Sequence, residues 1–317
     1  MTTRAGRSFT RSRSTDGSRD SCAEGCRCRR LRATGHRTFI TAAGARRRVR
    51  ERALRPARHG PPARLRPDVR IDVRTDGGRP IYTITPTLSS PVGSVVYAHG
   101  GGWVNEIALQ HWQLAAQIAA ESATVVSLPI SPLVPFGTAA EVTERVAALV
   151  VENRERYGPT CLAGDSAGGQ IALSTALALR DDGIALPVTV LISPAVDLSW
   201  SNPRIPEVQP TDPWLGVPGG QVLSDLWRGD RELTDPVVSP LFGDFAGLGP
   251  LTVLTGTRDV LNPDAHLLVA KARAAGVEVA FTEIAGQLHV YPLLPTREGA
   301  RARRVIVAAL REAVRRP

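Results

Sequence analysis

Apolar and polar residues alternate regularly from residue 68 onward, and this pattern predicts a series of strands and helices. Two alternating segments flank Asp76-Gly77-Gly78, which predicts two strands joined by a tight turn. Beyond them, short apolar runs typical of buried strands take turns with segments that carry apolar residues at helical spacing. The predicted strands are 68–75, 79–85, 94–99, 124–128, 160–163, 188–192, 251–255 and 277–282, and the predicted helices are 109–121, 139–157, 167–180, 265–275 and 296–315.

This order of strands and helices is typical of an α/β fold. Short strands separated by long helices form βαβ units, so we expect a mostly parallel sheet with helices on both faces. Residues 197–247 carry many Pro, Trp and Asp with little periodicity, and no element is predicted there. Ligands of such sheets bind at the carboxyl ends of the strands, so the residues that follow each strand are the candidates for chemistry.

The N-terminal segment differs from the rest of the chain in periodicity and charge. Residues 1–45 hold only isolated apolar residues, so we expect a disordered basic leader before a domain at 46–317, with a short basic helix over 46–58. Residues 1–66 hold 19 Arg against 4 acidic residues, whereas residues 67–317 hold 20 Lys and Arg against 26 acidic residues. The formal net charge of +9 therefore belongs to this segment and indicates no obligatory nucleic-acid partner. A transit peptide and an over-long translation start both stay open.

Composition also excludes other classes of protein and site. No apolar run approaches the roughly 18–20 residues of a transmembrane helix, and none follows the basic residues as in a secretory signal. Cys161 is the one cysteine of the domain, so we expect no internal disulfide and a cytoplasmic location. Cys22, Cys26 and Cys28 with His36 could be read as a zinc site, but their spacing and Arg- and Ser-rich surroundings favour no metal.

The sequence GDSAGG at 164–169 follows one predicted strand and opens the next helix. A G-x-S-x-G sequence in that place forms a sharp turn that presents its serine above the sheet. The small residues around Ser166 allow the close backbone approach that this turn needs, and the helix N-terminus favours developing negative charge. We expect Ser166 to be a nucleophile, and a glycine-rich packing turn with an idle serine is the alternative.

The sequence HGGGW at 99–103 follows another predicted strand. Glycines let backbone N–H groups approach a ligand without obstruction from a Cβ atom. Such donors, together with the N–H of Ala167 after the candidate nucleophile, form an oxyanion hole for a tetrahedral intermediate. The glycines lack the G-x-G-x-x-G spacing of a dinucleotide site. His99 directly precedes them, so we interpret it as a residue that orders the loop rather than as a base.

Two further polar residues follow strands near the C-terminus. Asp259 lies after the strand predicted at 251–255, and His289 lies after the one at 277–282. The order Ser166, Asp259, His289 is the order of the α/β-hydrolases. We expect His289 to take the proton of Ser166 and Asp259 to orient and stabilise the imidazolium.

Other acids and histidines compete for these roles. Asp197 follows the strand predicted at 188–192 and is a rival for the third member. Asp259 could instead cap the next helix, a role for which Asp264 competes. His111 and His266 lie within predicted helices, so we expect them to be packed or exposed to solvent.

These motifs resemble those of the hormone-sensitive lipase family of α/β-hydrolases, in particular its bacterial esterase and acetyl-hydrolase branch. The resemblance covers about residues 46–317 and rests on HGGGW at 99–103, GDSAGG at 164–169, SPAVDL at 193–198, SPL at 239–241, DVL at 259–261 with Asp264, and His289. It implies an α/β-hydrolase fold with an eight-stranded sheet and a serine carboxylesterase mechanism without metal or cofactor. It also implies that the oxyanion donors are the N–H groups of Gly101, Gly102 and Ala167.

The resemblance further implies a cap, made of about residues 46–66 and 197–235, over an acyl pocket. Trp103, Trp200 and Trp214 lie near or within the cap and could line the pocket, although ordinary packing explains them equally well. The expected partner is a small-molecule ester with a short- to medium-chain acyl group. A lactone, amide or thioester hydrolase and a non-catalytic binding protein on the same fold stay open, as does the oligomeric state.

One departure from the family pattern lies in the loop at 129–135. Many members carry YRLAPE after the strand that here ends at Ser127-Leu128, whereas this chain has PISPLVP at 129–135. The missing Arg and Glu remove a pair that stabilises the loop, which leaves the shape of the pocket open without affecting the triad. Plant hormone receptors of this fold lose the catalytic histidine, and the presence of His289 argues against a purely receptor role.

Overall fold

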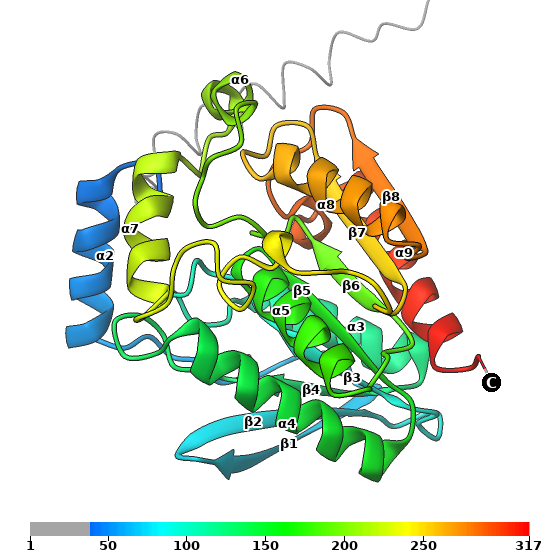
Figure 1. Ribbon diagram of the computed structural model, residues 1–317. Coiled ribbons are helices and arrows are strands. Elements are labelled where there is room, and N and C mark those ends of the chain that lie inside the picture. The colour runs from blue at the N-terminus through cyan, green and yellow to red at the C-terminus, as the bar shows by residue number, and fades with distance from the viewer. Residues whose placement is uncertain (1–38, 317) are drawn as a thin grey trace, which may run out of the picture. The chain divides into compact units, whose positions relative to one another are not determined.

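The structure is a computed structural model that describes residues 39–316, which fold around one eight-stranded sheet (Figure 1). The strand order is β1-β2-β4-β3-β5-β6-β7-β8; the pairs of β2 with β1 and β4 are antiparallel and all other pairs are parallel. This confirms the expected eight-stranded, mostly parallel sheet. The strands are β1 (Val69–Asp76), β2 (Arg79–Pro86), β3 (Ser94–Ala98), β4 (Val125–Pro129), β5 (Thr160–Asp165), β6 (Thr189–Ile192), β7 (Leu251–Gly256) and β8 (Val279–Ile284).

Helices cover both faces of this sheet, as the alternation of elements predicts (Figure 1). One hydrophobic cluster holds side chains of α4, α5 and α8, and a second cluster on the other face holds those of α3 and α9. Side chains of β3 alternate between the two clusters: Val96 belongs to the first, and Val95 and Tyr97 belong to the second. Both faces being buried explains why the central strands are continuous apolar runs. These helices are α3 (Leu109–Ser122), α4 (Ala139–Tyr157), α5 (Ala167–Asp181), α8 (Asn262–Ala274) and α9 (Arg297–Ala313).

The basic helix expected over residues 46–58 lies four residues earlier, as α2 (Ala42–Leu54). It begins there because the hydroxyl of Thr41 accepts a hydrogen bond from the N–H of Gly44 (3.1 Å). It ends before Pro56, since a proline disfavours helical backbone in the residue before it. Ala45 is fully buried in the first hydrophobic cluster. The boundary expected at residue 46 therefore falls inside a helix that packs on the domain.

The segment without predicted elements contains helix α7 (Val217–Trp227), which packs beside α2 (Figure 1). Sequence reasoning missed α7 because Gly219 and Gly220 weaken helical propensity. Packing requires both glycines: a Cβ on Gly219 would lie 2.1 Å from the carbonyl oxygen of Phe39, and one on Gly220 would lie 2.0 Å from the ring of Trp200. The same segment holds α6 (Ile205–Val208) and two 3₁₀ turns, η1 (Gln209–Thr211) and η2 (Pro240–Phe242), and a third, η3 (Tyr291–Leu293), follows β8.

In residues 39–316, no helix combines the length and the apolar character that a bilayer-spanning segment needs. Most of the expected leader, including Cys22, Cys26, Cys28 and His36, lies outside the described residues. Among the residues that the structure describes, there is no cluster of three or more Asp, Glu, His or Cys side chains that could hold a metal ion.

Candidate active site

Ser166 occupies a sharp turn between β5 and α5. Its backbone has φ 53° and ψ −118°, a conformation that non-glycine residues rarely adopt and that marks functional turns. The turn tolerates only glycine at two neighbouring positions. A Cβ on Gly164 would lie 2.1 Å from the carbonyl oxygen of Gly168, and one on Gly168 would lie 2.0 Å from that of Ala98. The small residues of this motif therefore serve close backbone approach, as the sequence indicates.

The structure brings Ser166, His289 and Asp259 together. Nε2 of His289 lies 2.8 Å from Oγ of Ser166, and Nδ1 of His289 lies 2.9 Å from Oδ2 of Asp259. An ionised carboxylate can only accept, so Nδ1 carries a proton and donates to Asp259, which leaves Nε2 free to accept from the Ser166 hydroxyl. Asp259 is fully buried and His289 is nearly so. This is the geometry of a nucleophile, a base and a group that orients the base.

Electrostatics at His289 favour its protonated form. Burial by itself lowers the pKa of His289, but the Asp259 carboxylate raises it, with smaller contributions from Asp212 and Asp165. The net effect places the pKa of His289 above its ordinary value. A base with a raised pKa accepts the serine proton more readily and stabilises the imidazolium that results.

The competing residues have other partners. The carboxylate of Asp197 accepts hydrogen bonds from Ser199 and Ser201. Asp264 is buried in the first turn of α8 and accepts from Nδ2 of Asn202 (2.7 Å). Burial raises the pKa of Asp264 to about 7. Neither carboxylate replaces Asp259 at His289.

His99, His111 and His266 have environments that match the expectations from the sequence. His99 is buried, and its Nδ1 donates to the carbonyl oxygen of Gly100 (2.7 Å), which suits a residue that orders the loop. Burial is the main cause that lowers the pKa of His99 to about 4. His111 is packed in α3, whereas His266 is partly exposed and contacts Glu283 (2.6 Å).

The glycine loop carries two candidate oxyanion donors, of which Gly102 lies next to the serine turn. Gly101 and Gly102 have φ values of 126° and 62°, which only glycine adopts without strain. Among the described residues, neither Gly101 nor Gly102 donates its N–H to another protein atom. Gly102 and Ala167 line the same small cavity as Ser166. Phe39 lies against Gly102, because a Cβ there would come within 2.6 Å of its ring.

Asp165 anchors this loop, a role that sequence reasoning missed although the residue adjoins Ser166. Its Oδ1 accepts from the N–H of Gly100 (2.9 Å) and from the hydroxyl of Tyr97 (2.8 Å). Its Oδ2 lies 3.1 Å from Nε2 of His111. Burial raises the pKa of the Asp165 carboxyl, but these donors outweigh it and keep the pKa below its ordinary value. The sequence signal for this role is an acidic residue at the end of an apolar strand, directly before Ser166.

A cavity of about 30 Å³ adjoins Ser166. Trp200, Leu215 and Leu223 line it from the segment 197–235 that is expected to form part of a cap, and Trp103 lines it from the glycine loop. Trp214, the third tryptophan expected near the pocket, is not among its lining residues. Apolar walls and a single reactive hydroxyl suit the acyl end of an ester.

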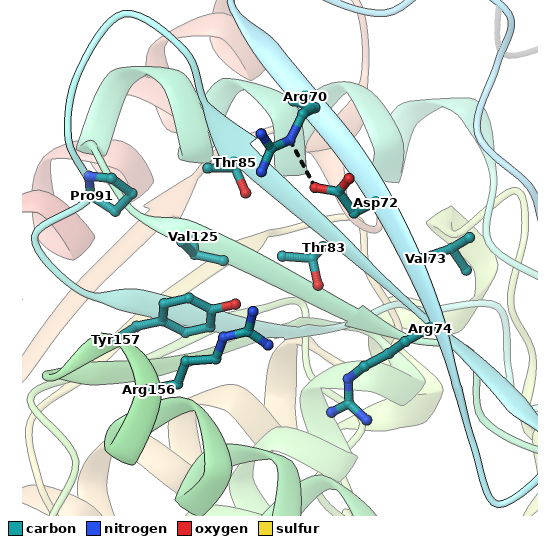
Figure 2. Close-up of a pocket in the computed structure, with 10 residues that line it drawn as sticks. All are labelled: Arg70, Asp72, Val73, Arg74, Thr83, Thr85, Pro91, Val125, Arg156 and Tyr157. Atoms are coloured by element: carbon teal, nitrogen blue, oxygen red, sulfur yellow. Dashed lines mark hydrogen bonds and ion pairs between the residues drawn. The ribbon is translucent and has the colours of Figure 1, made fainter.

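A larger groove, of about 690 Å³, lies away from these residues, between the β1–β2 hairpin and the end of α4 (Figure 2). Two of its three cations have acidic partners, since Arg70 pairs with Asp72 and Arg74 pairs with Glu152, and the guanidinium of Arg156 lies over the ring of Tyr157. Ser166, Asp259 and His289 do not line this groove. The larger volume therefore does not identify the candidate active site, because Ser166 lines the smaller cavity.

Comparison with known proteins gives consistent matches. A family model described as an alpha/beta hydrolase fold matches residues 95–293. A triacylglycerol lipase of Mycobacterium tuberculosis is 31% identical over 71% of this chain and 47% of its own length, and an acetyl-hydrolase of Streptomyces hygroscopicus is 32% identical over 69% and 76%. The crystal structure of an esterase from the bacterial hormone-sensitive lipase family has a TM-score of 0.75 at 26% identity, over 90% of this chain and 98% of that one. The chain thus spans about half of that lipase and three quarters of the acetyl-hydrolase.

Proposed function

This chain belongs to the hormone-sensitive lipase family of α/β-hydrolases and is an enzyme of the esterase and lipase class, and from that premise we propose that it hydrolyses carboxylic esters through an acyl-enzyme on Ser166. The observation that supports this most directly is the contact of Nε2 of His289 with Oγ of Ser166 at 2.8 Å. A serine hydroxyl is a weak nucleophile unless a base accepts its proton, and here the base is already in hydrogen-bond reach.

The proposed reaction has two halves that use the same residues. Oγ of Ser166 attacks the ester carbonyl while Nε2 of His289 takes the hydroxyl proton, and Asp259 stabilises the imidazolium. The N–H groups of Gly101, Gly102 and Ala167 stabilise the oxyanion. His289 then gives its proton to the leaving alcohol. In the second half, His289 deprotonates a water molecule that attacks the acyl-enzyme, and the imidazolium then returns this proton to Oγ of Ser166 as the acid leaves.

The cavity beside Ser166 limits the acyl group. Its volume of about 30 Å³ leaves room for roughly one or two water-sized groups. Trp200 closes it against Gly220 of α7, where even a Cβ atom would collide. Within the expected range of short to medium chains, we therefore place the preferred acyl groups at the short end, near acetyl.

Active-site labelling separates an esterase from a binding protein on the same fold. We expect a fluorophosphonate probe to label the native protein at Ser166, and the heat-denatured chain to remain unlabelled because the hydroxyl then has no base. The same preparation should hydrolyse p-nitrophenyl acetate. Parallel assays with lactone, amide and thioester substrates test the other hydrolase activities. A native protein that neither labels nor hydrolyses any of these would contradict the proposed function.

Replacing Trp200 by alanine should shift the acyl preference toward longer chains. The indole forms a wall of the cavity, so its removal opens space for several methylene groups. We expect the ratio of kcat/KM for p-nitrophenyl hexanoate to that for acetate to rise roughly tenfold or more, as pocket changes of this size commonly do. Trp214→Ala is the matched control, since Trp214 lies in the same cap but does not line the cavity. An unchanged ratio in Trp200→Ala would contradict the assignment of this wall.

The division of the chain and its cellular location are proposals of the same kind. We retain a basic leader followed by a hydrolase domain, with the domain extended to include α2 from Ala42. We propose a cytoplasmic location because Cys161, the one cysteine among the described residues, is free, which fits a reducing compartment. The expected partner is a small-molecule ester, without cofactor or obligatory nucleic acid.

A further inference from the structure

Asp212 is a buried carboxylate of the cap that neither the sequence motifs nor the proposed reaction uses. It follows η1 and is only 6% exposed. Burial of a carboxylate is costly unless hydrogen bonds compensate for the lost water. Asp212 has three such bonds, all from backbone N–H groups, and they come from two different parts of the protein.

One oxygen of Asp212 stabilises the turn that leads to Leu215, a lining residue of the acyl cavity. Its Oδ1 accepts from the N–H of Trp214 (2.8 Å) and from that of Leu215 (3.0 Å). Leu215 lines the cavity beside Ser166. The next residue, Gly216, donates its N–H to the carbonyl oxygen of Phe39 (3.1 Å). The turn at Asp212 thus determines where one wall of the cavity lies.

The other oxygen of Asp212 holds the backbone beside the catalytic acid. Its Oδ2 accepts from the N–H of Val260 (2.9 Å), the residue directly after Asp259. The following N–H, of Leu261, donates to Oδ1 of Asp259 itself (3.0 Å). Two consecutive N–H groups therefore bind two carboxylates, one from the cap and one from the triad. A second link runs alongside, from the guanidinium of Arg258 to the carbonyl oxygen of Thr211 (3.2 Å).

The charge of Asp212 also acts on the base. The carboxylates whose charges bear on His289 are those of Asp259, Asp212 and Asp165, and each raises its pKa against the effect of burial. For Asp212 itself, burial and the charge of Asp259 raise the pKa, whereas His289 and the N–H donors lower it. The net pKa of Asp212 is above its ordinary value.

We propose that Asp212 is a positioning residue that couples the cap to the triad: it fixes the Leu215 wall of the acyl cavity, fixes the backbone that carries Asp259, and supports the imidazolium of His289 by its charge. This inference rests on the proposed triad. Asp212 does not touch the reacting atoms, so its contribution passes through Asp259 and His289. It gives the cap a part in catalysis besides covering the substrate.

The test is the pH profile of kcat/KM for p-nitrophenyl acetate in the full chain. In wild type, the acid limb should have its midpoint above pH of about 6.5, because neutral His289 is the active form and its pKa is raised. Asp212→Asn removes the charge while keeping the size of the side chain. We expect kcat/KM to fall roughly tenfold to hundredfold and the acid limb to move to lower pH by roughly half a unit or more, since one of the charges that raise the pKa of His289 is gone.

Two further variants distinguish the effect of losing the Asp212 charge from the effect of disturbing the fold. Asp212→Glu keeps the charge, so its acid limb should stay near that of wild type even if its larger side chain lowers the rate. Asp212→Ser lacks the charge but retains an acceptor for the turn, and it replaces Asp212→Asn if circular dichroism shows that the latter does not fold. The matched control is Asp244→Asn, because Asp244 is exposed and its Oδ1 also accepts from the N–H two residues on, that of Ala246 (3.0 Å).

The outcomes are distinct. An acid limb that moves in the neutral variants and stays in place in Asp212→Glu and Asp244→Asn supports the inference. A folded neutral variant whose acid limb coincides with that of wild type overturns it, whatever its rate. Inactivity of wild type and Asp244→Asn alike would instead count against the proposed esterase function, since that result does not involve Asp212.

Discussion

Replacing Ser166 by alanine should reduce kcat for p-nitrophenyl acetate by roughly 10⁶-fold, close to the loss seen when a catalytic serine is removed from a hydrolase of this type. The physical reason is that, within residues 39–316, Oγ of Ser166 is the hydroxyl that forms a hydrogen bond with Nε2 of His289, at 2.8 Å. The alanine variant keeps the oxyanion donors, so a small residual rate above that of the uncatalysed reaction should persist. Steady-state assays at the pH optimum measure the effect.

The control for this variant is Ser90→Ala, which changes an exposed serine of the loop after β2. It should retain wild-type kcat, and both variants should show the thermal unfolding midpoint of wild type because neither hydroxyl supports the core. A Ser166→Ala protein that retains more than about a tenth of the wild-type rate would refute the acyl-enzyme mechanism, since a missing nucleophile costs far more than one oxyanion donor.

Replacing Asp259 by asparagine should lower kcat by about 10⁴-fold. The asparagine oxygen can still accept from the N–H of Leu261, so the local turn should survive. The amide nitrogen, however, would then face Nδ1 of His289, where the structure places a carboxylate oxygen at 2.9 Å. Because both groups would donate, the imidazole must adopt the tautomer that protonates Nε2, which can no longer accept the proton of Ser166.

Asp197→Asn is the matched control for the acid, because Asp197 is the buried rival that also follows a strand. Its carboxylate accepts from Ser199 and Ser201 and has no contact with His289, so we expect a loss of less than about tenfold. Assays of both variants with the same substrate decide between the two acids. If Asp197→Asn lost activity as severely as Asp259→Asn, the identity of the third member of the triad would have to be revised.

Local pattern was enough to locate most of the architecture. All eight expected strands were found within two residues of their predicted limits. The first two show as alternating segments around a tight turn, and the central ones show as short apolar runs because both of their sheet faces are buried. The places of Ser166, Asp259 and His289 followed from the same logic. Each lies just beyond a strand, and parallel strands deliver the residues that follow them to one edge of the sheet.

The cap could not be predicted in the same way. Helix α7 contains two adjacent glycines, which local propensity counts against a helix, and only the close approach of Phe39 and Trp200 explains them. The helix expected at residue 46 begins earlier, at Ala42, for a related reason. Residues 39–45 carry little apolar periodicity, yet Ala45 is buried by contacts with distant segments.

The chain order of motifs therefore specified the sheet, the proposed nucleophile and its proposed base, since these depend on spacing along the chain and on the chemistry of single residues. Which cap residues reach the triad depended on contacts between segments far apart in sequence. Asp212 and Val260 are 48 positions apart, and Tyr97 and Asp165 are 68 apart. A buried carboxylate is distinguished from an ordinary turn aspartate only by what packs around it, so these supporting residues and the small size of the acyl cavity became visible in the folded chain alone.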